Sequence, residues 1–163
     1  MAVSSFFLKG LMKILNDEIQ LTTDNLKVAL VGTDYVFDNE SEFFDTGVVD
    51  VNNPKNEALV ATSYVPQALP SDPLFAISLT GDGSVLMAVP DINFGVIGGA
   101  TNDTVHGAIL YKDTGLDTTS PVIAFIPIDT PTATTGVLFN ADFNTTAEGA
   151  NLVIGLPDQT GGS

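Results

Sequence analysis

TVHGAILYKDTGLDTTSPVIAFIPI, residues Thr104–Ile128, contains two apolar segments joined by a polar one. Side chains alternate between the two faces of a strand, and both Thr104–Lys112 and Val122–Ile128 are apolar on most of both faces. Strands of this kind suit the middle of a covered sheet. The intervening Asp113–Pro121 is rich in turn-forming residues. We therefore expect a central β-hairpin with an acidic surface loop at its tip.

Strict alternation also predicts which side chains share a face of this hairpin. One face of the first strand should carry Val105, Gly107, Ile109 and Tyr111, and one face of the second should carry Val122, Ala124, Ile126 and Ile128.

Shorter strands are expected on either side of the hairpin. They are Leu26–Val31, Leu59–Val65 as a short edge strand, Phe75–Leu79, Val85–Val89, a segment around Ile92 and Phe94, Val137–Phe143 and Leu152–Leu156. Gly81–Ser84 predicts a hairpin turn, and Asp129–Gly136 predicts a turn rich in Thr and Pro. About eight strands at short spacing predict a mainly β chain, a β-sandwich or barrel-like domain with one N-terminal helix.

The N-terminal segment predicts that helix, capped by Ser4 or Ser5 and ending near Asn16. Its apolar stripe consists of Phe7, Leu8, Leu11, Met12, Ile14 and Leu15. Such a stripe must be buried against a sheet or a neighbouring chain, and packing on its own sheet is the favoured interpretation. We divide the chain into residues 1–20, a helix that packs on the core, and 21–163, a single β-rich domain.

Charge and composition restrict the partners. The chain has 20 acidic residues against five basic ones, all of them lysines, for a formal net charge of −15. This balance argues against nucleic acid and anionic membranes, which require several cationic contacts. Without cysteine there is no disulfide or thiolate metal site, and no apolar run reaches the length of a membrane span. The acidity serves solubility or complements a basic partner surface.

The sequence predicts no enzyme. The single histidine, His106, lies in the middle of a predicted strand, and no G-x-S-x-G motif offers it a nucleophile. Asp113 and Asp117 could form a carboxylate pair, although a solvated turn is the commoner explanation for them. Gly81-Asp82-Gly83 is too short for a phosphate loop and lacks the lysine.

The segment Asp34–Asp45, DYVFDNESEFFD, mixes aromatic and acidic residues. Its aromatic side chains are expected to hold a surface loop in place while its carboxylates stay in water. The hard oxygen ligands that suit calcium occur close together at Asp38, Glu40, Glu42 and Asp45. The spacing of a helix–loop–helix calcium site is missing, so a charged loop is the main interpretation and calcium the alternative. No cofactor is expected otherwise.

Five blocks of this sequence, in order, resemble a known family. They are LKVALVGTDYVFD (Leu26–Asp38), ATSYVPQAL (Ala61–Leu69), DINF (Asp91–Phe94), AILYKDTG (Ala108–Gly115) and TSPVIAFI (Thr119–Ile126). Their order and spacing resemble those of small virion structural proteins of tailed bacteriophages, over about Leu21 to Phe143. The segment PSDPLFAISLTGDGSVLMAV, residues 70–89, is interpreted as a local elaboration between the second and third blocks.

The resemblance implies a non-enzymatic part of a phage head or tail. A capsid decoration (cement) protein that binds and stabilises the major capsid protein shell is the preferred interpretation. A tail or neck subunit and a fibre-associated module that binds a receptor or glycan are the alternatives. The expected partners are the major capsid protein or other virion proteins, together with further copies of the chain; a trimer would suit closed symmetry. The expected location is the outer capsid surface of the virion, after synthesis in the host bacterial cytoplasm.

Two loops are expected to contact the capsid or a sister copy, Asp34–Asp45 and Asp113–Ser120. The residues predicted to lie at these interfaces are Tyr35, Phe37, Phe43, Phe44, Asp113 and Asp117.

Overall fold

A computed structural model describes residues 5–44, 59, 61–69, 77–79, 85–88, 92–141 and 151–154, with the side chains of 77–79, 85–88, 129 and 151–154 left out of the description. The described part is mainly β, with antiparallel sheets and one α-helix, which confirms the predicted fold class. No helix within these ranges is long and apolar enough to cross a membrane.

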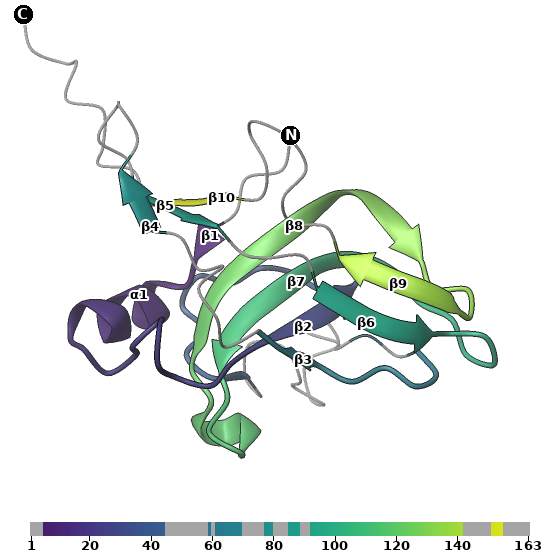
Figure 1. Ribbon diagram of the computed structural model, residues 1–163, viewed down its shortest axis with the longest axis horizontal. Coiled ribbons are helices and arrows are strands. Elements are labelled where there is room, and N and C mark those ends of the chain that lie inside the picture. The colour runs from purple at the N-terminus through teal and green to yellow at the C-terminus, as the bar shows by residue number, and fades with distance from the viewer. Residues whose placement is uncertain are drawn as a thin grey trace, which may run out of the picture.

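The largest sheet has five antiparallel strands. Its spatial order is β1 (Ser5–Phe6), β8 (Val122–Ala133), β7 (Thr104–Lys112), β2 (Leu26–Gly32) and β3 (Gln67–Ala68). The predicted hairpin, β7 and β8, lies at the centre of this sheet, as its two apolar faces require (Figure 1). Both edge strands, β1 and β3, are two residues long.

Two smaller sheets complete the described strands. β6 (Ile92–Ile97) pairs with β9 (Val137–Ala141), while β4 (Ile77–Leu79), β5 (Val85–Ala88) and β10 (Asn151–Ile154) form a sheet of order β10-β5-β4. Figure 1 shows β6 and β9 crossing the five-stranded sheet, with β4, β5 and β10 to one side near β1. The described strands form no closed barrel, and the β-sandwich stays a prediction.

The five-stranded sheet is buried on both faces, by different means. On one face, Leu110 belongs to a core that includes Phe94 of β6 and Phe139 of β9. On the other, Ile109 belongs to a cluster that includes Tyr35 and Phe44 from the segment that follows β2. We call these the strand-covered face and the loop-covered face.

Two irregularities break the predicted alternation in the hairpin. Tyr111 pairs with Val122 and Leu110 with Ala124, so Ile123 is an extra residue in β8. An extra residue shifts the side chains that follow it to the opposite faces. The prediction that Val122 shares a face with Ala124, Ile126 and Ile128 is therefore wrong, because Val122 lies on the loop-covered face with Phe125.

The second irregularity lies between Val105 and Gly107, and it places Val105 on the strand-covered face rather than beside Ile109. It also corrects the end of β8. The ladder resumes with Val105 opposite Thr132 and ends with Thr104 opposite Ala133, so most of the predicted turn Asp129–Gly136 is strand. The register shift leaves residues 128–131 of β8 outside the pairing, which explains how a strand that contains Pro131 is tolerated.

The predicted edge strand Leu59–Val65 is wrong where it is described. Leu59 and residues 61–65 are not strand, and the edge strand is β3, two residues after Val65. Two hydrogen bonds to Leu30 replace strand pairing here. The Tyr64 hydroxyl accepts a hydrogen bond from Leu30 N at 2.6 Å, and Leu59 N donates to Leu30 O at 3.3 Å.

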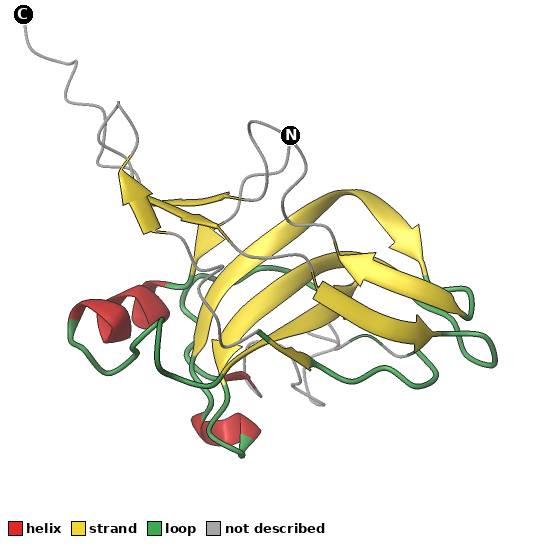
Figure 2. Cartoon of the chain, viewed as in Figure 1, coloured by secondary structure: helices red, strands yellow, loops and turns green. Residues whose placement is uncertain are grey.

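The helix α1 spans Leu8–Leu15 and begins later than predicted. Ser5 pairs with Phe125 in the sheet, and the N-cap is Phe7, without a side-chain cap. The helix lies at one end of the sheet, beside β1 and the start of β8 (Figure 2). Gly10 faces the β8 backbone so closely that a Cβ atom would collide with Val122 O.

Candidate functional site

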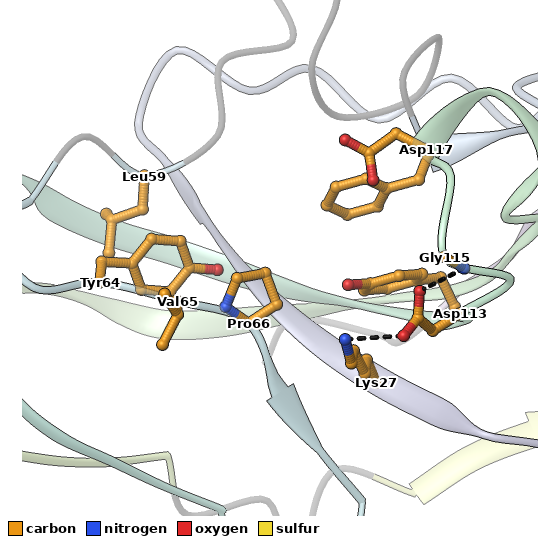
Figure 3. Close-up of a pocket in the computed structure, with 10 residues that line it drawn as sticks. Lys27, Leu59, Tyr64, Val65, Pro66, Asp113, Gly115 and Asp117 are labelled. Carbon is orange, nitrogen blue, oxygen red and sulfur yellow. Dashed lines mark hydrogen bonds and ion pairs between the residues drawn. The ribbon is translucent and has the colours of Figure 1, made fainter.

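A groove of about 550 Å³ opens beside β2. Figure 3 shows Leu59, Tyr64, Val65 and Pro66 on one side of it and Asp113, Gly115 and Asp117 on the other. The full set of lining residues is Lys27, Phe44, Leu59, Tyr64, Val65, Pro66, Tyr111, Asp113, Gly115 and Asp117. The groove therefore lies between the segment that leads into β3 and the loop at the tip of the central hairpin.

An ion pair forms the polar end of the groove. Lys27 Nζ lies 2.7 Å from Asp113 Oδ2, and Asp113 also accepts hydrogen bonds from Gly115 N at 3.0 Å and Asn25 Nδ2 at 3.2 Å. The hydrogen bond from Lys27 is the main reason that the pKa of Asp113 lies below its usual range, with a further contribution from Gly115 N–H. Asp113 is thus held ionised and serves the loop as a turn-forming residue.

Two phenol rings supply the apolar side. Tyr111 stacks on Phe44 with 4.2 Å between ring centroids. Burial raises the pKa of the Tyr111 hydroxyl, and the charges of Asp113 and Asp117 raise it further. Burial likewise raises the pKa of Tyr64, whose hydroxyl bonds to the Leu30 backbone. Both phenols stay protonated at neutral pH.

The acidic loop at the hairpin tip is ordered by its own hydrogen bonds. Ser120 is buried, and its hydroxyl donates to Leu116 O at 2.8 Å and accepts from Thr114 N at 3.1 Å. Asp117 begins the 3₁₀ turn η1 (Asp117–Thr119) with an exposed side chain. The loop presents Leu116 and Asp117 to solvent on a fixed backbone. These contacts support the turn interpretation of Asp113 and Asp117.

The structure separates the six residues predicted to form an interface. Phe44, Asp113 and Asp117 line the groove. Tyr35 is buried and Phe37 half-buried, and both rings pack on Phe125 at centroid distances of 5.1 and 5.6 Å.

Phe43, the last of the six, is half-buried, with Lys13 Nζ 5.7 Å from the ring centroid. The expectation that aromatic residues hold the Asp34–Asp45 loop is confirmed for Tyr35, Phe37 and Phe44. The carboxylates of Asp34, Asp38 and Glu40 are exposed, as expected. The interface role of these six residues stays a prediction.

Three of the four acids considered for calcium, Asp38, Glu40 and Glu42, are described, and they form no metal-binding group. Glu42 forms ion pairs with Lys9 at 3.2 Å and Lys13 at 3.5 Å, which directs its carboxylate toward α1. Asp38 Oδ1 accepts a hydrogen bond from Glu40 N. Asp45 lies outside the described residues. No group of three or more His, Cys, Asp or Glu side chains within the described ranges could hold a metal ion.

His106 is half-buried on β7, with its ring 6.3 Å from that of Phe125. The groove, by contrast, is lined by an ion pair and two protonated phenols. Such groups can hold a peptide segment by shape and hydrogen bonding.

Sequence reasoning missed the side of the groove that comes from Leu59 and residues 64–66. Nothing in that segment marks a site, because its role depends on Tyr64 reaching β2 across the fold. Lys27 offered a weak signal, since it is the only charge in the strand LKVALVG. Comparisons of the chain with protein-family models, curated proteins and solved structures each found no match.

Proposed function

We propose that this chain is a non-enzymatic structural protein of a tailed-bacteriophage particle, and that it decorates the outer capsid surface by binding the major capsid protein. The observation that carries the proposal is the ordered set of sequence blocks that resembles small virion proteins. Three of the blocks contain β2, most of β7 and the first part of β8, which are neighbours in the largest sheet. These three blocks therefore form one contiguous part of that sheet.

The distribution of charge supports binding to a basic protein surface. Each lysine of the described part is in an ion pair with a carboxylate of the same chain: Lys9, Lys13, Lys27 and Lys112. The chain has 20 acidic residues, so most of them have no lysine to neutralise them. An excess of uncompensated carboxylates favours encounter with a positively charged partner and disfavours anionic ones.

The two acidic loops are suited to presenting a rigid surface. Phe44 N donates to Ser120 O at 2.8 Å, which links the segment after β2 to the loop at the hairpin tip. Preorganised loops lose little conformational freedom on binding. On a capsid lattice, many such contacts would add up to durable attachment through avidity.

A tail or neck subunit is the second candidate, because the resemblance covers head and tail proteins alike. A module that binds glycans or receptors on a fibre is less well supported. Such a module would need exposed aromatic rings, and two of the four aromatic residues in Asp34–Asp45 that could serve, Tyr35 and Phe44, are buried. The two structural candidates differ in copy number: a decoration protein follows the capsid lattice, whereas a neck protein forms one small ring.

The test is to purify the phage particles that carry this chain, label it, and determine its position and stoichiometry by electron microscopy and quantitative mass spectrometry. We expect it over the whole shell in proportion to the major capsid protein. Adding the purified chain to undecorated capsids should raise their melting temperature. A single ring at the neck would favour the second candidate, and absence from the particle would overturn both.

A further inference from the structure

One side of the helix α1 lies against the sheet, and the opposite side exposes three large apolar side chains. Leu8, Met12 and Leu15 are 44, 61 and 76 % exposed. Their spacing of four and three residues places them on one face of a helix. Gly10, on the opposite side of the helix, lies against the β8 backbone. We call Leu8, Met12 and Leu15 the outer stripe.

The packing of α1 on β8 keeps the outer stripe turned away from the sheet. Gly10 fits against Val122 and Ile123 because it has no side chain, and any other residue of α1 turned toward β8 would bring a Cβ atom into that backbone. Hydrogen bonds fix the start of the helix: Phe7 N donates to Ile123 O at 3.0 Å and Leu8 N to Asn39 O at 2.9 Å. Among the described residues, these contacts hold the stripe away from the sheet.

The outer stripe is flanked by carboxylates at both ends. The hydrogen bond from Leu8 to Asn39 places Asp38 and Glu40, both exposed, near the start of the helix. Asp17 and Glu18, also exposed, follow directly after its end.

The two lysines of α1 do not reverse this charge. Lys9 and Lys13 form ion pairs with Glu42, and Lys13 also pairs with Glu18. The surroundings of the stripe are thus acidic.

We propose that α1 is a docking element, whose outer stripe inserts into an apolar groove of a second protein that is lined at its rim by lysine or arginine. Helices that bind in grooves use anchors at this spacing. Complementary charge at the rim would select the partner and set the orientation of α1. The inference rests on the geometry of α1 and is independent of the proposed function; on a phage shell it would identify the surface that faces the capsid.

A second copy of the chain fits the stripe less well. In a two-fold antiparallel pair of α1 helices, Asp38 and Glu40 of one copy would meet Asp17 and Glu18 of the other. Like charges brought together at both ends of the contact oppose that arrangement.

The experiment uses the full chain and two synthetic amphipathic helical peptides with the same leucine face. One peptide has lysines on both flanks of that face and the other has glutamates. Affinities are measured by fluorescence anisotropy for the unaltered chain, for Met12→Gln and Leu15→Gln, and for the matched controls Leu138→Gln and Val137→Gln. The controls change apolar residues of β9 that are 55 and 60 % exposed. Glutamine is a good helix former, so α1 is retained in the stripe variants.

We expect the lysine peptide to bind, and Met12→Gln or Leu15→Gln to weaken it by about tenfold, since each removes one apolar anchor. The two β9 variants should bind like the unaltered chain, the glutamate peptide should not bind, and salt should weaken the complex. Equal losses in the stripe and β9 variants, or equal binding of both peptides, would overturn the proposal.

Two further outcomes would assign the stripe to another occupant and overturn the proposed partner. The first is a dimer of the chain in sedimentation that Met12→Gln dissociates and Leu138→Gln does not. The second is a photo-crosslink from a reactive residue at position 12 to the same chain in its monomeric form. Absence of the chain from phage particles would instead refute the proposed function and leave the peptide result standing.

Discussion

Both faces of the five-stranded sheet are buried, but by covers of different kinds. Leu110 and Ile109, neighbours on β7, are both fully buried on opposite faces. The cover over Leu110 includes β6 and β9, which are joined to each other by a ladder of hydrogen bonds. The cover over Ile109 includes rings from the segment after β2, which has no regular structure between Gly32 and Phe43 apart from turns.

The difference shows how a loop can cover a sheet. Aromatic rings, here Tyr35, Phe37 and Phe44, bury a large area from few residues, so a short irregular segment suffices. The backbone of that segment bonds to Leu8, Val122 and Ser120, and the carboxylates of Asp34, Asp38 and Glu40 stay exposed. The loop-covered face is therefore where this protein combines a core with an acidic surface.

The largest effect that separates the two covers is expected from core truncations on β7. Leu110→Ala and Ile109→Ala should each lower the free energy of unfolding by about 2–5 kcal/mol. Leu110→Ala should cost about 1 kcal/mol more, because a loop can close over a cavity better than a paired ladder can. Urea unfolding of the two variants gives the comparison directly. Equal costs would mean that the loop is as rigid a cover as the strands.

The next largest effect concerns the packing of α1 on β8, at one end of the five-stranded sheet. Gly10→Ala should destabilise the chain by about 1–3 kcal/mol, as overpacking does. The sign of this change in stability is informative, because replacing glycine by alanine at an exposed position of a helix stabilises the protein by about 1 kcal/mol. Thermal and urea unfolding test it, with Leu15→Ala at an exposed position as the control. A stabilised Gly10→Ala variant would show that α1 is not held against β8.

A smaller effect distinguishes local from global opening. Phe44→Leu removes the stack on Tyr111 and should cost about 0.5–1.5 kcal/mol beyond the lost area. Amide exchange near Phe44 should become faster than in the rest of the sheet, because separate hydrogen bonds rather than a paired ladder hold this cover. Phe94→Leu, on the strand-covered face, should accelerate exchange only through global unfolding. The comparison fails if both variants give the same pattern of exchange.

The smallest effect is electrostatic and depends on pH. The hydrogen bond from Lys9, with the charges of Lys9 and Lys13, holds the pKa of Glu42 below its usual value despite some desolvation. The unfolded pKa is about 4.3, so the stabilisation is complete above that pH and is lost as pH falls through the lower folded-state pKa.

Glu42→Gln should therefore cost about 0.2–1 kcal/mol at neutral pH, and the difference from the unaltered chain should shrink below about pH 4. Unfolding free energies between pH 7 and the acid limit of stability measure it, and Glu40→Gln in the same segment is the control. A cost of Glu42→Gln that is independent of pH would show that the ion pairs with α1 are not its source.

Alternating apolar segments were enough to predict the hairpin β7–β8, its central position and the mainly β class, because a strand that is apolar on both faces must be covered on both. The bulge at Ile123 could not be predicted, since any residue of that apolar run could have been the extra one. The start of α1 was missed for a related reason: Ser5 suits a helix cap, but pairing with Phe125 takes it into the sheet.

The residues of the candidate site were likewise predicted only in part. Asp113 and Asp117 were predicted to lie on a surface loop because turn-forming residues are local signals. Lys27 and Tyr64 were not found, because their contacts join positions far apart in the chain.

Local residue patterns encode the central hairpin, the turn chemistry at its tip and the excess of negative charge, since all three depend on residues close together or on simple sums. The cover that each face of the sheet receives, the position of the groove and the exposed side of α1 arise only when the chain has folded. Those outcomes depend on close packing between distant segments, such as Gly10 against β8, and no local pattern encodes such a fit.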